Sequence, residues 1–201
     1  MIIETIVVGE IQTNCYILAE DKNSDCIIID PGSDYENIKA ILDKNKLIPR
    51  FIINTHGHID HIGANGNFKI PIFIHRLDSN FLDNPEKSLS LFFGNSKTSP
   101  KSSRQLEDND IVELRDLKVK VIHTPGHTLG SICLKIDSIL FTGDTLFFEG
   151  IGRTDFPESD EKKLIKSIRE KLFTLPDDII IYPGHGPSST IGYEKENNPF
   201  L

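Results

Sequence analysis

The stretch T-H-G-H-I-D-H, residues 55–61, concentrates three histidines and one aspartate in a span of six residues. No packing requirement brings three imidazoles and a carboxylate together, so the cluster indicates ligand chemistry. In an extended segment, residues i and i+2 point the same way, so His56 and His58 can reach one metal ion. If the chain then turns, Asp60 and His61 face a second point close by. Imidazole and carboxylate suit zinc, iron or manganese, and zinc is the commonest outcome.

Three more candidate ligands lie further along the chain, and each directly follows a glycine. They are His127, Asp144 and His185, and each comes shortly after a predicted strand. Strand ends are rigid supports for loops, which is where binding sites are usually built. The seven candidate ligands exceed the three or four that one zinc ion normally takes. The sequence therefore predicts a site for two divalent metal ions, with zinc favoured over iron or manganese.

The other histidines and the cysteines fit a structural role better than a chemical one. A single histidine after a strand, such as His75 or His123, is more often a surface or satisfied core residue than a ligand. Cys15, Cys26 and Cys133 are widely spaced in apolar, strand-like stretches, odd in number and without a C-x-x-C pair. We expect these cysteines to be reduced and buried.

Hydrophobic periodicity predicts a fold that mixes strands and helices. Short apolar, β-branched runs predict strands, and apolar residues at helical spacing predict helices. Ser33 and Glu36 form a capping-box pattern at the start of the first helix. The predicted strands are residues 2–8, 15–19, 26–29, 51–53, 70–74 and 179–182, with strand pairs over 111–122 and 131–142, and the predicted helices are residues 34–45 and 160–173. The class is therefore α/β or α+β with substantial sheet.

Four large apolar residues precede a polar loop, residues 94–103, that shows no periodicity. They are Leu89, Leu91, Phe92 and Phe93. They can belong to the core or edge a substrate cleft, and we favour the core.

Length and composition limit the function. The 201 residues fit one domain, and 38% apolar with 26% charged residues are ordinary for a globular protein. A formal net charge of −8, without any run of Lys and Arg, argues against nucleic acid and membranes as partners. The first residues lack the features of a signal peptide, and no apolar run approaches the roughly 18 residues of a membrane span. We expect a soluble cytoplasmic protein, and the sequence leaves its oligomeric state open.

Four motifs together resemble the metallo-β-lactamase superfamily, across nearly the whole chain. They are T-H-G-H-I-D-H (55–61), T-P-G-H-T-L-G-S (124–131), T-G-D-T-L-F (142–147) and P-G-H-G-P (183–187). The resemblance implies an αββα sandwich, in which two mixed β-sheets are flanked by helices and the metals lie at one edge. It also implies a catalytic centre with one metal at His56, His58 and His127, a second at Asp60, His61 and His185, and Asp144 bridging both. The catalytic residues are then Asp60 and Asp144.

Further motifs narrow the resemblance to short glyoxalase II-like hydrolases. Asp144 in its G-D-T-L-F context looks like the bridging carboxylate of the glyoxalase II branch. The stretch G-R-T-D-F (152–156) is similar to one shared by these hydrolases and by persulfide dioxygenases. The end, T-I-G-Y-E-K-E-N-N-P-F-L (190–201), looks like the short hydrolases. Full-length glyoxalase II continues into a helical glutathione-binding domain, so we expect residues 1–201 to form a single domain without it.

The resemblance implies hydrolysis of a small thioester of the S-lactoylglutathione type, with a hydroxide shared by two metals as nucleophile. Arg153 can anchor a substrate carboxylate, although an ion pair with Asp155 is the favoured alternative. A second enzyme hypothesis is persulfide oxidation by one iron held by His56, His127 and Asp144. A metal-binding interaction module without catalysis would lack a ligand, and none is missing. The net charge disfavours RNA processing, and Asp144 disfavours β-lactam hydrolysis, because antibiotic-destroying relatives generally carry cysteine there.

Overall fold

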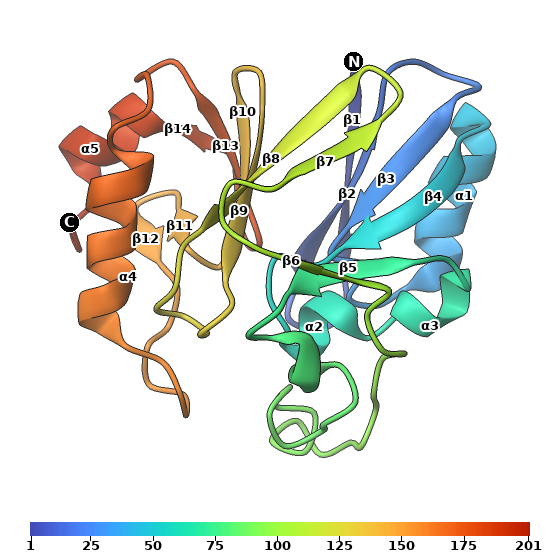
Figure 1. Ribbon diagram of the computed structural model, residues 1–201, viewed down its shortest axis with the longest axis horizontal. Coiled ribbons are helices and arrows are strands. Elements are labelled where there is room, and N and C mark those ends of the chain that lie inside the picture. Colours follow the sequence, from blue (N-terminus) through green and yellow to red (C-terminus); the bar gives the residue numbers. More distant parts are fainter.

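The protein is a sandwich of two six-stranded sheets with helices on both outer faces, described by a computed structural model for all 201 residues (Figure 1). The first sheet has the order β1-β2-β3-β4-β5-β6. Its strands are β1 (Ile2–Val8), β2 (Thr13–Ala19), β3 (Asp25–Ile29), β4 (Ile48–Ile53), β5 (Ile72–His75) and β6 (Arg104–Leu106). The β1–β2 and β2–β3 pairs are antiparallel, and the remaining pairs are parallel.

The second sheet has the order β14-β13-β10-β9-β8-β7. Its strands are β7 (Ile111–Leu114), β8 (Leu117–His123), β9 (Ile132–Ile136), β10 (Ile139–Gly143), β13 (Ile180–Pro183) and β14 (Ser189–Thr190). Only β10 and β13 pair in parallel, so the carboxyl ends of these two strands meet at the same edge. A small hairpin of β11 (Leu146–Phe147) and β12 (Gly150–Ile151) follows β10.

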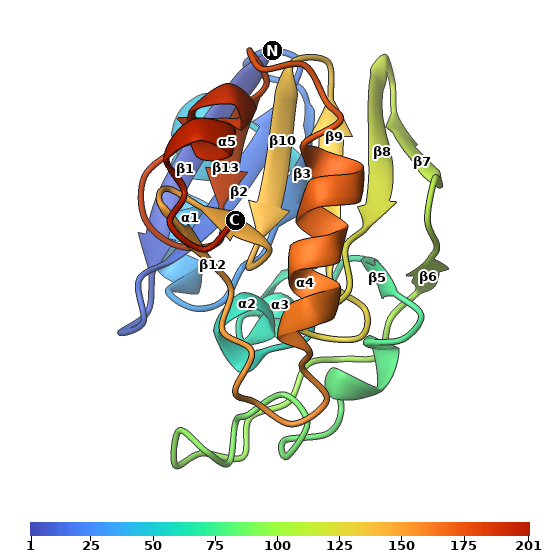
Figure 2. The same cartoon turned by 90° about the vertical axis from the view of Figure 1, so that its left-hand side faces the viewer.

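Helices cover the outer face of each sheet (Figures 1 and 2). The first sheet is flanked by α1 (Tyr35–Asn45), α2 (Ile59–Ile62) and α3 (Asn65–Phe68), and the second by α4 (Glu161–Ser167) and α5 (Ile191–Asn197). A 3₁₀ turn, η1 (Ser79–Phe81), follows β5, and α4 continues into a π-helical segment, η2 (Ile168–Leu172). No helix is long and apolar enough to span a bilayer.

Three apolar clusters hold these layers together. The largest has 16 buried residues from both sheets and fills the space between them. A second, of 15, packs the first sheet against α1 to α3, and a third, of 10, packs the second sheet against α4 and α5. Strands β2 and β3 are buried along their whole length because both of their faces are covered. β7, at an edge, instead alternates between buried and exposed residues.

The predicted mixed αββα class is confirmed, and the strand pairs predicted over 111–122 and 131–142 form antiparallel hairpins. The capping-box prediction is wrong. Asp34, not Ser33, precedes the first helical residue, in a left-handed conformation with φ of 50° and without a capping side-chain bond. Its carboxylate instead accepts a hydrogen bond from Gly9 N, so a tertiary contact has replaced the local cap.

The core assignment for the segment before the polar loop is wrong for three of its four residues. Leu89 is buried, whereas Leu91, Phe92 and Phe93 are 54%, 69% and 44% exposed. Phe93 lines a cavity, in agreement with the alternative prediction that these residues edge a cleft. The three cysteines are free and buried, as expected.

Candidate metal centre

The seven candidate ligands converge at one edge of the sandwich from four different connections. His56 and His58 follow β4, and Asp60 and His61 lie in the short helix α2 that comes next. His127 lies between β8 and β9, Asp144 follows β10, and His185 follows β13. Their ligand atoms form three overlapping groups, each within 4.8 Å: His56, His58 and His127; His56, His61 and Asp144; Asp60, His61 and His185.

The first group is a cage of three imidazoles. His127 Nε2 lies 2.9 Å from His58 Nδ1 and 3.3 Å from His56 Nε2, and the last two atoms are 3.1 Å apart. Zinc binds histidine nitrogen at about 2.0–2.1 Å, so nitrogens sharing a tetrahedral zinc lie about 3.3 Å apart. The three nitrogens therefore fit a common metal ion without rearrangement.

The other two groups share His61 and join carboxylates to imidazoles. His185 Nε2 lies 3.3 Å from Asp60 Oδ2 and 3.6 Å from Asp144 Oδ2, and His61 Nε2 lies 3.3 Å from Asp144 Oδ1. Both His61 Nε2 and Asp144 Oδ1 are buried without a hydrogen-bond partner. Such orphaned polar atoms are costly unless something else satisfies them. A cation between them fits both, and Asp144, whose other oxygen lies 3.6 Å from His127 Nε2, also faces the three-histidine cage.

The pKa shifts separate three neutral imidazoles among the candidate ligands from the side chains around His61, which carry charge. Burial lowers the pKa values of His56 and His127 and lowers that of His58 to about 3, so these three imidazoles are neutral, the form that binds metals. Burial alone would lower the pKa of His61, but the charges of Asp60 and Asp144 raise it overall. Without metal, a proton on His61 balances these carboxylates, and a cation can take its place.

Two hydrogen bonds outside the ligand set fix which ring nitrogen faces the metals. Asp30 Oδ2 accepts from His61 Nδ1 at 2.9 Å, and the Arg153 carbonyl accepts from His127 Nδ1 at 2.8 Å. A carboxylate or carbonyl only accepts, so both imidazoles carry hydrogen on Nδ1 and present the lone pair of Nε2 inward. Asp30, which follows β3 directly, was not among the residues predicted from the sequence.

Asp78 ties two ligand-bearing connections together. Its buried carboxylate accepts hydrogen bonds from Gly57 N at 3.1 Å, Gly130 N at 2.6 Å and Thr128 Oγ1 at 2.7 Å. Burial raises its pKa to about 6, against the lowering effect of these bonds. Gly57 separates two ligands and Thr128 adjoins a third, so Asp78 positions the three-histidine cage. No local sequence pattern indicates this role.

Two glycines next to ligands permit the close packing. A Cβ on Gly184 would lie 2.1 Å from Asp144 Oδ1 and 2.8 Å from His61 Cε1. Gly143, which precedes Asp144, has φ of 48°, and a Cβ there would lie 2.4 Å from Thr55 Oγ1. The sequence analysis noted both glycines, and the structure supplies the steric reason for them.

A cavity of about 200 Å³ opens onto the metal centre. Its apolar wall comes from five residues: Ile11, Leu89, Phe93, Phe147 and Phe156. The Arg153 guanidinium also lines it, but Nε and Nη2 bind the Asp155 carboxylate at 2.9 and 2.8 Å, which is the ion pair favoured from the sequence.

His75 and His123 lie outside the metal-ligand groups. Their rings stack on one another with centroids 4.1 Å apart. His123 Nε2 is 2.9 Å from the Leu129 carbonyl, and Leu77 N donates to His75 Nδ1, so both rings have local polar partners.

Comparison with known proteins agrees with this architecture. A family model described as the metallo-beta-lactamase superfamily matches residues 8–185, and the chain belongs to that superfamily. The chain thus combines the fold of a metallo-hydrolase superfamily with a candidate His/Asp metal site.

Among relatives, hydroxyacylglutathione hydrolase GloC of Haemophilus influenzae is 38% identical, over 100% of this chain and 98% of its own. The crystal structure of the B3 metallo-beta-lactamase BLEG-1 matches with a TM-score of 0.94 at 36% identity, covering 100% of this chain and 99% of that one. The crystal structure of TTHA1623 in a di-iron-bound form matches with a TM-score of 0.87 at 32% identity, covering 98% of this chain and 100% of that one.

Proposed function

We propose that the protein is a dinuclear metal-dependent hydrolase that cleaves a small thioester of the S-lactoylglutathione type. One observation carries the proposal: the seven side chains form overlapping ligand groups, and Asp144 lies 3.3 Å from His61 and 3.6 Å from His127. The first metal would be held by His56, His58 and His127, the second by Asp60, His61 and His185, with Asp144 between them. Similarity to a relative named hydroxyacylglutathione hydrolase supports the thioester class.

Two bound metal ions, most simply zinc, would polarise the substrate carbonyl and acidify a water molecule. The chain's own residues orient and shield this chemistry. Thr13 Oγ1 donates to Asp60 Oδ2 at 3.0 Å and fixes that carboxylate, which lies beside the 24%-exposed His185. Asp60 or Asp144 would accept the proton of the attacking water. Oxygen adds to the carbonyl carbon, the C–S bond breaks, and the leaving thiolate needs no strong acid because thiols have modest pKa values.

The apolar cavity wall would hold the acyl side of the substrate. Phe156 lies edge-on to His58 with ring centroids 5.6 Å apart, and Phe93 lines the same cavity. These rings exclude bulk water from the reacting carbonyl and strengthen electrostatic interactions there. Arg153 would bind a substrate carboxylate only by exchanging Asp155 for it.

The test uses zinc-loaded protein under anaerobic conditions. We expect it to release free thiol from S-lactoylglutathione, detected with a thiol reagent, and to bind about two zinc ions per chain by elemental analysis. A β-lactam panel belongs in the same experiment because one similar structure is that of a metallo-beta-lactamase. If the protein hydrolyses a β-lactam but none of the thioesters, the proposed substrate class is wrong, whereas the assignment as a metal-dependent hydrolase stands.

Persulfide oxidation is the second candidate. His56, His127 and Asp144 lie together, with His127 Nε2 3.3 Å from His56 Nε2 and 3.6 Å from Asp144 Oδ2, so an iron facial triad is available. An iron-loaded protein that takes up oxygen with glutathione persulfide, beside a zinc form silent on all thioesters, would favour this candidate. Hydrolysis by the zinc form in the absence of oxygen excludes oxidation as the explanation of that turnover.

A further inference from the structure

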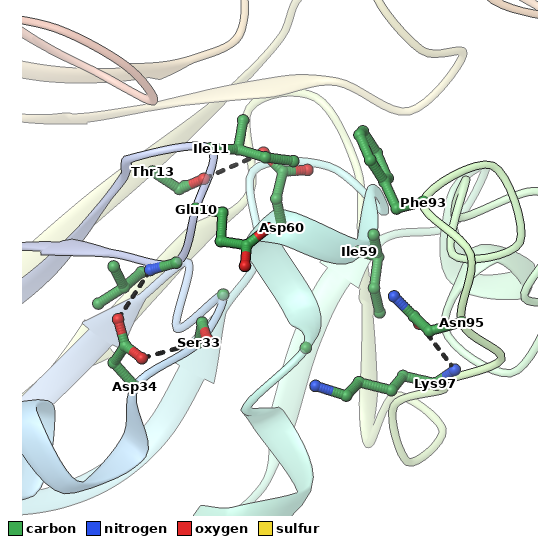
Figure 3. A pocket seen from close by; sticks show the side chains of 14 residues that line it. Glu10, Ile11, Thr13, Ser33, Asp34, Ile59, Asp60, Phe93, Asn95 and Lys97 are labelled. Carbon is green, nitrogen blue, oxygen red and sulfur yellow. Dashed lines mark hydrogen bonds between the residues drawn. The ribbon is translucent and has the colours of Figure 1, made fainter.

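A larger polar hollow continues from the mouth of the metal centre. Its volume is about 630 Å³, within the range of small-molecule sites. Ile11, Asp60 and Phe93 line both this hollow and the metal-centre cavity, so the two spaces adjoin. Figure 3 shows Ile11 and Phe93 on either side of Asp60, with the turn between β1 and β2 on one side and the 94–103 loop on the other.

The hollow is lined by polar groups that have no partner within the protein. Lys97 makes no ion pair, and its Nζ has no hydrogen bond in the structure. Asn95 accepts hydrogen bonds from Lys97 N at 3.1 Å and from Ser90 Oγ through its oxygen, which leaves its Nδ2 amide free to donate. Across the hollow, Glu10 makes neither an ion pair nor a side-chain hydrogen bond.

The fold holds these groups in place from both sides. Asp34 Oδ2 accepts from Gly9 N at 2.8 Å, which ties the residue before Glu10 to the start of α1. The bonds from Ser90 and Lys97 to Asn95 hold the 94–103 loop against the segment before it. The hollow thus offers two hydrogen-bond donors, one of them cationic, facing a free carboxylate.

We propose that this hollow binds the zwitterionic, α-amino-acid end of the thiol carried by the substrate. The substrate carboxylate pairs with Lys97 and the Asn95 amide, and its ammonium group pairs with Glu10. The inference rests on the proposed function, because a thioester held at the metals must extend its thiol portion out of the smaller cavity. A polyphosphate tail fits worse, since Glu10 and Asp34 outnumber the one lysine and would repel it.

The kinetic test compares three thioesters of one acyl group: glutathione, whose γ-glutamyl end is zwitterionic, coenzyme A, and neutral N-acetylcysteamine. We expect the lowest KM with glutathione. Lys97→Gln and Glu10→Gln should each raise that KM about tenfold, the loss of one charge-assisted contact, with little change in kcat or in the KM for N-acetylcysteamine. The control is Lys101→Gln, in the same loop but paired with Asp83 at 3.4 Å, which should change nothing.

A chemical control isolates the ammonium contact. Acetylating the γ-glutamyl amine removes the positive charge, so the acetylated thioester should have a raised KM that Glu10→Gln no longer affects. Equal KM values for all three thiols, or a glutathione KM unmoved in both variants, would overturn the proposal.

Binding of S-methylglutathione, measured by calorimetry on the zinc-loaded protein, separates this proposal from the proposed function. If no thioester is hydrolysed but S-methylglutathione binds the wild type about tenfold more tightly than either variant, the hollow is confirmed and the thioesterase fails. The opposite outcome is that thioesters are hydrolysed while S-methylglutathione binds the wild type and both variants with equal affinity, or binds none of them. In that case the thioesterase stands and the proposal for the hollow is overturned.

Discussion

Replacing Asp30 with asparagine tests how an outer hydrogen bond fixes the second metal site. The Asp30 carboxylate is 1% exposed and accepts from Thr55 N at 2.8 Å, Thr55 Oγ1 at 2.6 Å and His61 Nδ1 at 2.9 Å. Because a carboxylate only accepts, His61 carries its hydrogen on Nδ1 and turns the lone pair of Nε2 toward Asp60 and Asp144.

Asparagine has the same size but only one accepting oxygen. If that oxygen keeps the bond from Thr55 N, the amide NH₂ faces His61 Nδ1, and the imidazole must move its hydrogen to Nε2. That tautomer offers no lone pair to a metal. The opposite amide orientation leaves the buried Thr55 N–H unpaired, which costs about 1–3 kcal/mol, so the first orientation is favoured.

We therefore expect Asp30→Asn to weaken the second metal about 10–100-fold while the first metal is retained. Zinc titration against a competing chelator measures both affinities, and the free energy of unfolding should fall by about 1–3 kcal/mol. Asp25→Asn is the matched control, because Asp25 begins the strand that Asp30 directly follows but pairs with Arg50 and Arg115 away from the site. Two zinc ions bound by Asp30→Asn with wild-type affinity would refute the tautomer argument.

Three further predictions concern the ligands, the packing around them and the response to acid. Asp144→Asn removes the charge shared by both ligand groups, so turnover should fall by about 10²-fold or more and zinc content by one per chain, with His75→Ala as the control that keeps turnover. Gly184→Ala, which places a Cβ 2.1 Å from Asp144 Oδ1, should lose metal by elemental analysis while circular dichroism shows the fold retained; full zinc occupancy would contradict the steric argument. Burial lowers the pKa of His75 to about 4, so the unfolded chain binds a proton first, and stability present above about pH 6.5 is lost as the pH falls toward 4. Metal-free His75→Gln should lose about 1–2 kcal/mol less than wild type between pH 7 and 5 in urea titrations, after allowance for solvent screening, and equal losses would exclude His75 as the titrating group.

The candidate ligands could be selected from the sequence because coordination chemistry depends on residue type and short spacing. Three imidazoles and a carboxylate within residues 55–61 have no packing explanation, and the structure brings all seven candidates together. The strands were equally accessible, since β2 and β3 are covered on both faces and therefore appear as continuous apolar runs. The assignment of the seven candidate ligands to two metals is a prediction from the geometry of the site.

Other features required the tertiary structure. The expected cap at Ser33 is absent, because the Asp34 carboxylate accepts a hydrogen bond from Gly9 N, 25 residues away. Local sequence does not indicate that competing contact. Phe93 was assigned to the core because hydrophobicity alone does not distinguish a core from the wall of a cleft.

The chain by itself determined the class, the candidate ligands and the strands, because each depends on residue identity and local periodicity. The tertiary structure decided how those ligands are oriented. Asp30 reaches His61 across 31 residues and Asp78 reaches Gly130 across 52, and neither aspartate lies in a pattern that marks its partner. Such hydrogen bonds require β3, β4 and β5 to lie side by side and the second sheet to pack against them, since short polar contacts depend on the relative position of whole layers.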